Sequence, residues 1–160
     1  MTTPDSRRNF LRGRFSPRAG PLRPPWALAE ADFLNRCTRC GDCVRACPTK
    51  IIVDHDAGYP GIDFSVGECT FCGDCRTACQ TGALQSSDGQ VPWAARALIN
   101  EGCLAHQRVE CRVCGEQCAV AAIRFPPRAG GIALPVLDPA RCTGCGACVS
   151  PCPVQAIAVA

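Results

Sequence analysis

The sequence lacks any apolar run that could cross a membrane. Nowhere among its 160 residues do about 18 apolar residues follow one another, as a membrane-spanning helix requires. It also lacks a glycine-rich phosphate loop, a flavin-binding fingerprint and any evident pairing of a nucleophile with a base. We therefore expect a protein without a membrane span and without enzymatic activity of its own.

Histidine is scarce, and the excess positive charge is confined to one end of the chain. His55 and His106 fall in expected turn or loop segments, where we expect surface or hydrogen-bonding roles and no metal ligation. The net charge of +3 arises within residues 1–32, and the rest of the chain is balanced. Residues 1–32 are also rich in proline and glycine, which predicts a flexible basic tail. A neutral body and few aromatic residues in this tail argue against nucleic-acid binding.

The tail contains an arginine pair that resembles the start of a twin-arginine export signal. Arg7 and Arg8 are followed by Phe10 and Leu11. A cleavable signal needs about 7 to 15 apolar residues after its basic start, but further arginines interrupt every candidate run here. We therefore expect a cytoplasmic protein. Its tail is then either a solvated arm or a segment that docks on an acidic surface or on the chaperone of genuine export signals.

Cysteine, in contrast, is abundant, and its spacing is regular. The sixteen cysteines form four groups of four, and three groups follow the spacing C-x2-C-x2-C-x3-C without exception. This is the ligand spacing of bacterial ferredoxins, in which three thiolates hold one 4Fe-4S cluster and the fourth cysteine binds the other cluster. We expect four 4Fe-4S clusters, held by all sixteen cysteines as iron ligands. The groups are Cys37, Cys40, Cys43 and Cys47; Cys69, Cys72, Cys75 and Cys79; Cys103, Cys111, Cys114 and Cys118; and Cys142, Cys145, Cys148 and Cys152.

The third group departs from this spacing. Its first cysteine, Cys103, lies eight positions before Cys111, so a longer loop must fold back to deliver that ligand. We expect this loop to be the softest part of the protein and its cluster to be the most easily lost.

Disulfides and structural zinc fit the cysteine pattern less well than iron-sulfur clusters. Cysteines three positions apart on a tight turn are poorly placed to bridge one another. Zinc sites use cysteine pairs separated by a spacer, whereas these groups contain evenly stepped triplets. A brown protein that dithionite bleaches would exclude zinc.

The four groups divide the chain into two similar halves. We expect an α+β fold of two tandem ferredoxin-like modules, residues 33–85 and 101–160, joined by a linker at residues 86–100. If fourth cysteines are exchanged within each module, the clusters have defined ligands. Cluster one takes Cys37, Cys40, Cys43 and Cys79; cluster two takes Cys69, Cys72, Cys75 and Cys47; cluster three takes Cys103, Cys111, Cys114 and Cys152; and cluster four takes Cys142, Cys145, Cys148 and Cys118.

Short strands and helices are expected around the cysteine groups. Each group should end in one or two helical turns, and apolar segments flanking glycine and proline predict a hairpin in each module. Trp93 should pack between the modules, followed by a short linker helix. Modules this small bury little apolar surface, so the protein without clusters should be largely unfolded. The expected hairpins join residues 50–54 to 61–65 and 122–125 to 133–138, and further strands are expected at 82–85 and 155–159.

Beyond its cysteines, the chain resembles the NapF family of ferredoxin-type proteins, which are encoded with periplasmic nitrate reductases. The resemblance covers essentially the whole chain and includes features that generic ferredoxins do not share. It implies a cytoplasmic iron-sulfur protein that binds the catalytic subunit of this nitrate reductase before export and helps to install or reduce that subunit's 4Fe-4S cluster. A freestanding polyferredoxin that carries electrons is the alternative. The shared features are SRR at residues 6–8, RPPW at 23–26, GYP at 58–60 and CLAHQRVEC at 103–111.

Overall fold

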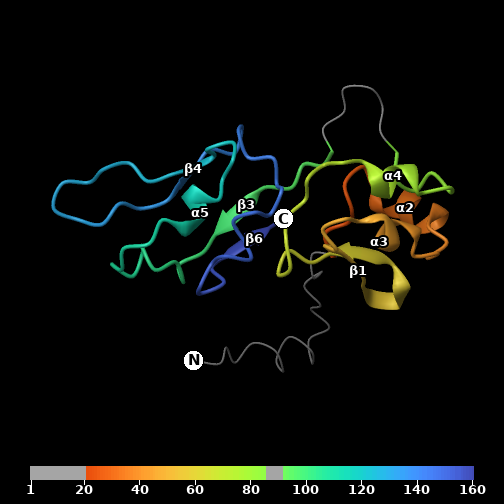
Figure 1. The fold of residues 1–160 in the computed structure, drawn as a ribbon, viewed down its shortest axis with the longest axis horizontal. Coiled ribbons are helices and arrows are strands. Elements are labelled where there is room, and N and C mark those ends of the chain that lie inside the picture. The colour runs from red at the N-terminus through yellow and green to blue at the C-terminus, as the bar shows by residue number, and fades with distance from the viewer. Residues whose placement is uncertain (1–20, 86–91) are drawn as a thin grey trace, which may run out of the picture.

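The computed structural model describes residues 21–85 and 92–160 and contains only short elements. The two modules lie side by side, with the C-terminal end of the chain near the middle of the molecule (Figure 1). None of the helices in the described residues is long and apolar enough to cross a membrane. The helices are α2 (Glu30–Arg36), α3 (Asp42–Ala46), α4 (Asp74–Thr77) and α5 (Val113–Glu116), and the strands are β1 (Ile52–Asp54), β2 (Pro60–Ile62), β3 (Ala97–Ile99), β4 (Ile123–Arg124), β5 (Val136–Leu137) and β6 (Ile157–Val159).

The hairpin predicted in the first module is confirmed. Strands β1 and β2 are antiparallel, with Ile52 opposite Ile62. Strand β2 ends at Ile62, earlier than predicted, because the carboxylate of Asp63 accepts a hydrogen bond of 2.8 Å from the backbone N–H of Ser65. Such a local turn offers the backbone an alternative to the strand ladder.

The second module has the other predicted hairpin, in a shorter form. Strands β4 and β5 are antiparallel, with Ile123 opposite Leu137. Prolines stand close to both strands, at Pro126, Pro127 and Pro135. Proline has no backbone N–H to donate, so the ladder does not extend to the full predicted segments.

The predicted linker helix after Trp93 is wrong, because the segment forms strand β3. This strand pairs antiparallel with the C-terminal strand β6, and Ala97 lies opposite Val159. Arg96 and Ala160 extend the ladder with backbone hydrogen bonds of 2.8 and 3.1 Å. Alanine, arginine and leucine favour a helix, but long-range pairing overrides that preference. The strand predicted at the C-terminal end is confirmed, and β3 belongs to the second module.

Residues 21–32 pack on the first module, so the predicted flexible tail over residues 1–32 is wrong for this part of it. Residues 1–20 lie outside the described residues. Pro24 and Pro25 are among the largest fully buried side chains. Proline loses little side-chain entropy on burial, so a segment rich in breakers still joins the core.

Arg23 is one of the positive charges of residues 1–32, and it holds elements of the first module together. Its guanidinium donates hydrogen bonds of 2.7 and 3.0 Å to the carboxylate of Glu30 and one of 3.1 Å to the carbonyl of Pro60. It also lies over the Phe33 ring, 4.9 Å from the ring centroid, and over the ring of Tyr59. The hydrogen bond from Arg23 lowers the pKa of Glu30. Arg23 therefore fastens helix α2 to strand β2 and carries no free charge.

Trp93 packs between the modules, as predicted. Its ring meets those of Phe64 and Phe71 in the first module edge-on, at centroid distances of 6.1 and 5.9 Å. Its Nε1–H donates a hydrogen bond of 2.9 Å to the carbonyl of Thr143 in the second module. A Cβ atom on Gly146 would lie only 2.1 Å from the Phe64 ring, so the close approach of the modules requires glycine there.

Each module has a small core built partly from cysteine. Phe33, Ile51 and Phe64 are the larger apolar members of the first core, and the second core relies on smaller residues. No polar or charged side chain is fully buried in the described part of the chain. The buried cysteines of the two cores are Cys43, Cys47, Cys75, Cys114 and Cys148.

Candidate iron-sulfur sites

The third cysteine of every group is buried. Cys43, Cys75 and Cys114 lie on helices α3, α4 and α5, and Cys148 lies in a turn. Burial, with a smaller effect of neighbouring thiolates, raises the pKa of Cys43 and Cys114 to about 11 and that of Cys75 and Cys148 to about 12. These thiols hold their protons until a metal displaces them.

Three of the four groups reach their buried cysteine through a left-handed glycine. Gly41, Gly73 and Gly146 have φ angles of 73°, 84° and 81°. This conformation favours glycine and allows the close backbone approach expected from the sequence. The third group has Arg112 at this place, with a φ angle of −133°, so its backbone approaches helix α5 differently.

All four groups share a second left-handed position, three residues after the fourth cysteine. The turn directs a backbone N–H at the sulfur: Ala122 donates to Cys118 Sγ at 3.2 Å, and Ala156 donates to Cys152 Sγ at 3.3 Å. The third group therefore forms the same turn after its fourth cysteine as the other groups, although its first cysteines are spaced differently. Sequence reasoning missed this position because glycine occupies it only once. The four residues are Lys50, Gly82, Ala121 and Gln155, with φ angles of 59°, 67°, 49° and 51°.

Three cavities are each lined by four cysteines. Each set takes its fourth cysteine from the other group of the same module, which is the arrangement that the exchange of fourth cysteines predicts. Of the predicted fourth set, Cys142 and Cys145 lie close enough to Cys148 to influence its pKa, and the place of Cys118 stays a prediction. The sets are Cys37, Cys40, Cys43 and Cys79; Cys47, Cys69, Cys72 and Cys75; and Cys103, Cys111, Cys114 and Cys152.

The donors around these cavities fit 4Fe-4S clusters. All sixteen cysteines are free thiols, and four thiolates are the usual ligands of such a cluster. Among residues 21–85 and 92–160, no three metal-binding side chains converge closely enough to hold a single metal ion. The thiols instead surround a space, and neither His55 nor His106 lines it. A bound cluster would supply one-electron redox chemistry at each set.

Comparison with known proteins agrees with this geometry. Residues 36–84 and residues 107–156 each match the family described as "4Fe-4S dicluster domain". The chain is 47% identical over 161 residues to "Ferredoxin-type protein NapF" of Haemophilus influenzae, with 94% of this chain and 91% of that protein covered. The chain belongs to the NapF family of ferredoxin-type proteins. The resemblance seen in the sequence is thereby confirmed, as are its two tandem 4Fe-4S domains.

Other relatives lie within and beyond this family. The NapF protein of Escherichia coli K12 is 43% identical over 152 residues, which cover 95% of this chain and 92% of that protein. "Methylamine utilization ferredoxin-type protein MauM" of Methylobacillus flagellatus is 36% identical over 167 residues, which cover 94% of this chain and 71% of that protein.

The structure supplies one cysteine that the domain match does not cover. Cys103 lies before the second matched range, yet it lines the same cavity as Cys111. The loop between them folds into hydrogen-bonded turns, in which the N–H of Val109 donates to the carbonyl of Leu104 at 2.9 Å. Ala105, in the same loop, is only 1% exposed. An ordered backbone therefore presents Cys103 to the cavity.

The two cysteine sets of each module lie close enough to influence each other electrostatically. The thiolate of Cys43 contributes to the raised pKa of Cys75, and the thiolate of Cys114 contributes to that of Cys148, although burial is the larger cause in both. Each of these pairs joins cysteines of different sets.

A backbone hydrogen bond joins the cysteine sets across the module boundary. The N–H of Cys69 donates to the carbonyl of Cys145 at 2.8 Å, and the Cys145 thiolate lies close enough to contribute to the raised pKa of Cys69. The sets that contain Cys69 and Cys145 are thus the inner ones. The sets that begin with Cys37 and Cys103 each neighbour one inner set, so the four sets follow one another in a single series, which we call the row of cysteine sets.

In the first module, each fourth cysteine also shares a hydrogen bond with a threonine hydroxyl. Thr49 Oγ1 lies 3.5 Å from Cys47 Sγ, and Thr81 Oγ1 lies 3.6 Å from Cys79 Sγ. Burial alone raises the pKa of both thiols, but these hydroxyls and nearby backbone N–H groups lower it overall. A cysteine bound to iron has no proton, so the threonine hydroxyl must be the donor.

Replacing Thr49 or Thr81 by valine is expected to lower the midpoint potential of one first-module cluster. The hydrogen bond stabilises the extra negative charge of the reduced state, and its loss corresponds to a shift of up to about 60 mV, a tenfold change in a one-electron equilibrium. A redox titration followed by electron paramagnetic resonance (EPR) measures this shift. The second module has Val120 and Val154 at the equivalent places, so Val154→Thr is the matched control and should raise a potential. Unchanged potentials in both threonine variants would contradict this role.

Proposed function

We propose that this iron-sulfur protein is an accessory factor for the maturation of a periplasmic nitrate reductase. It holds four 4Fe-4S clusters and binds the unexported precursor of the catalytic subunit in the cytoplasm. There it assists the insertion or reduction of the subunit's own 4Fe-4S cluster, through contact and electron donation. It has no catalytic activity of its own. The chain belongs to the NapF family, and the resemblance to that family implies this role. Family membership therefore supports the choice of partner.

The row of cysteine sets is the structural observation that best supports electron transfer. Its inner sets meet through the hydrogen bond between Cys69 and Cys145, and its outer sets lie in different modules. A protein of this kind suits two partners, with a redox donor at one end and the precursor at the other.

The remaining basic residues of the tail are candidates for precursor binding. Arg23 is neutralised by Glu30, which leaves Arg7, Arg8 and their neighbours in residues 1–20 as the positive charges available to an acidic surface. A deletion that tests these residues should stop before Pro24 and Pro25, because both prolines are buried in the first module.

Anaerobically purified full-length protein is expected to capture the tagged precursor in a lasting complex. A variant that lacks residues 2–20 should capture less of it and should keep its clusters, which visible absorbance checks. Unchanged capture by this variant would show that the tail does not dock the precursor. Failure of the full-length protein to form the complex would contradict the proposed function itself.

A freestanding polyferredoxin is the second candidate, and one observation favours it. Cys40 and Cys72 are exposed, so two cysteine sets are accessible to a passing redox partner. This function predicts rapid electron transfer to several proteins without a lasting complex, so the capture experiment also separates the two candidates.

A further inference from the structure

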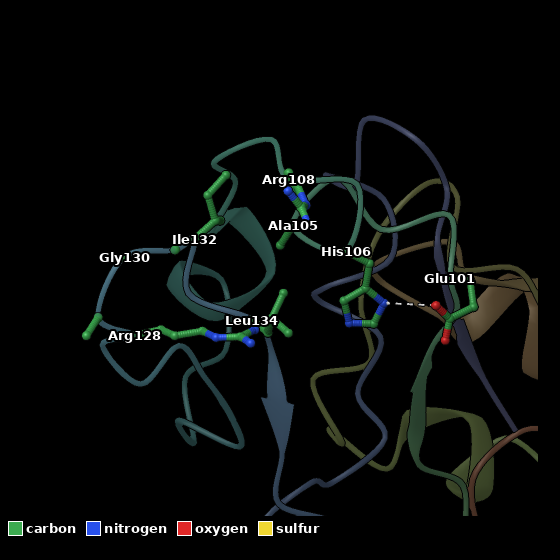
Figure 2. A pocket seen from close by; sticks show the side chains of 10 residues that line it. Glu101, Ala105, His106, Arg108, Arg128, Gly130, Ile132 and Leu134 are labelled. Carbon is green, nitrogen blue, oxygen red and sulfur yellow. Dashed lines mark ion pairs between the residues drawn. The ribbon is translucent and has the colours of Figure 1, made fainter.

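A further cavity among the described residues lies apart from the cysteines. Its volume is about 740 Å³, within the range of about 300–1,000 Å³ that is usual for ligand pockets. Glu101 and two loops form it: the long loop between Cys103 and Cys111, and the loop between β4 and β5 at the far end of the second module (Figures 1 and 2). The loop after Cys103 therefore serves two cavities, since Cys103 lines a cysteine set and His106 and Arg108 line this pocket.

The pocket is lined by arginines whose guanidinium groups have no partner among the described residues. Most arginines of residues 21–85 and 92–160 donate to a carboxylate or a backbone carbonyl. The side chains of Arg36, Arg108 and Arg128 make no hydrogen bond or ion pair with any other described residue, and two of these three line the pocket. Figure 2 shows Arg108 and Arg128 on its two different loops. Unpaired guanidinium groups are ready to bind carboxylate oxygens in bidentate geometry.

The acidic residue of the pocket does not cancel this charge. Glu101 is 98% exposed and faces His106, with 3.7 Å between its Oε2 and the histidine Nδ1 (Figure 2). That Nδ1 is buried and has no hydrogen-bond partner among the described residues. Two arginines therefore remain against one carboxylate at the rim, and the pocket is net positive.

We propose that this pocket docks an acidic segment of a protein partner beside the third cysteine group. The cavity is larger than a single inorganic oxyanion requires, and two guanidinium groups on separate loops can hold two carboxylates. The inference rests on the proposed function only for the identity of the partner, which would meet the outer end of the row of cysteine sets. Charge complementarity of this kind favours encounter and orientation.

The test uses the full-length, cluster-loaded protein and a fluorescent polyglutamate peptide, with binding measured by anisotropy. The wild type should bind the peptide saturably, and R108Q and R128Q should each weaken binding roughly tenfold. The R36Q variant is the control for R108Q and R128Q, because Arg36 is an exposed arginine outside the pocket and its removal takes away the same charge. Visible absorbance and circular dichroism establish that each variant keeps its clusters and fold.

Three outcomes would overturn the proposal. They are the absence of saturable binding, an equal loss of binding in R36Q and in the R108Q and R128Q variants, and displacement of the peptide by sulfate beyond the effect of matched sodium chloride. The last outcome would identify a site for a free oxyanion.

Precursor capture is measured separately. If the wild type binds the peptide through Arg108 and Arg128 but captures no precursor, the pocket stands and the proposed function fails. If R108Q/R128Q loses the peptide and still captures the precursor, the proposed function stands and the pocket is not its docking place.

Discussion

Removal of iron by a chelator under reducing conditions is expected to unfold both modules. The described helices span four to seven residues and the strands two or three, so none is stable without tertiary contacts. Five cysteines are buried in the two small cores. Without metal, the cavities that the cysteines line are empty and the modules lose the ligand bonds that would hold them together. Loss of cluster ligation should therefore remove the whole free energy of unfolding, about 5–15 kcal/mol for a typical domain.

Circular dichroism and dispersion of the proton NMR spectrum measure this unfolding. The control is the same protein in the same buffer without chelator, and iron and sulfide added back anaerobically should restore both signals. A chelated protein that keeps a dispersed spectrum and a cooperative urea transition would show that the polypeptide folds without clusters.

The Cys47→Ser variant is expected to damage the second cluster before the first. Cys47 belongs to the first group in the sequence, but in the structure it lines a cavity with Cys69, Cys72 and Cys75. Its partner in the exchange, Cys79, lines the cavity of the first group. Serine is a poorer ligand for iron than cysteine, so the affected cluster should be lost or should show a changed EPR signal.

Two other variants identify which cluster is affected. Cys75→Ser alters a residue of the second set, and Cys43→Ser alters a residue of the first. The EPR signal changed by Cys47→Ser should be the one changed by Cys75→Ser. If it is instead the one changed by Cys43→Ser, the fourth cysteines are not exchanged.

The local parts of this architecture, the exchange of fourth cysteines and the packing of Trp93 could be predicted from the sequence, whereas the pairing of distant segments could not. Cysteine spacing fixes which thiols share a turn, and glycine and proline mark the hairpins, because both effects act within a few residues. Strand β3 was mistaken for a helix because its partner, β6, lies more than 50 residues away in the chain. Residues 21–32 were assigned to a flexible tail because proline content does not reveal that Pro24 and Pro25 are buried.

Two features of the sites were not predicted from the sequence. The left-handed turn after each fourth cysteine is occupied by Lys50, Ala121 and Gln155 in three groups, and these residue types do not indicate a positive φ angle. The pocket with Arg108 and Arg128 is formed by two loops that meet only in the folded chain. The signal that could have indicated the pocket was the length of the loop after Cys103, which was interpreted as softness.

Iron, acid-labile sulfide and EPR spins, quantified on one anaerobic preparation, show whether the sixteen cysteines hold four 4Fe-4S clusters. We expect a brown protein with about 16 iron atoms and about 16 sulfides per chain, and signals of interacting 4Fe-4S clusters after reduction. A colourless preparation that is well folded, or one that holds zinc in place of iron, would contradict this expectation.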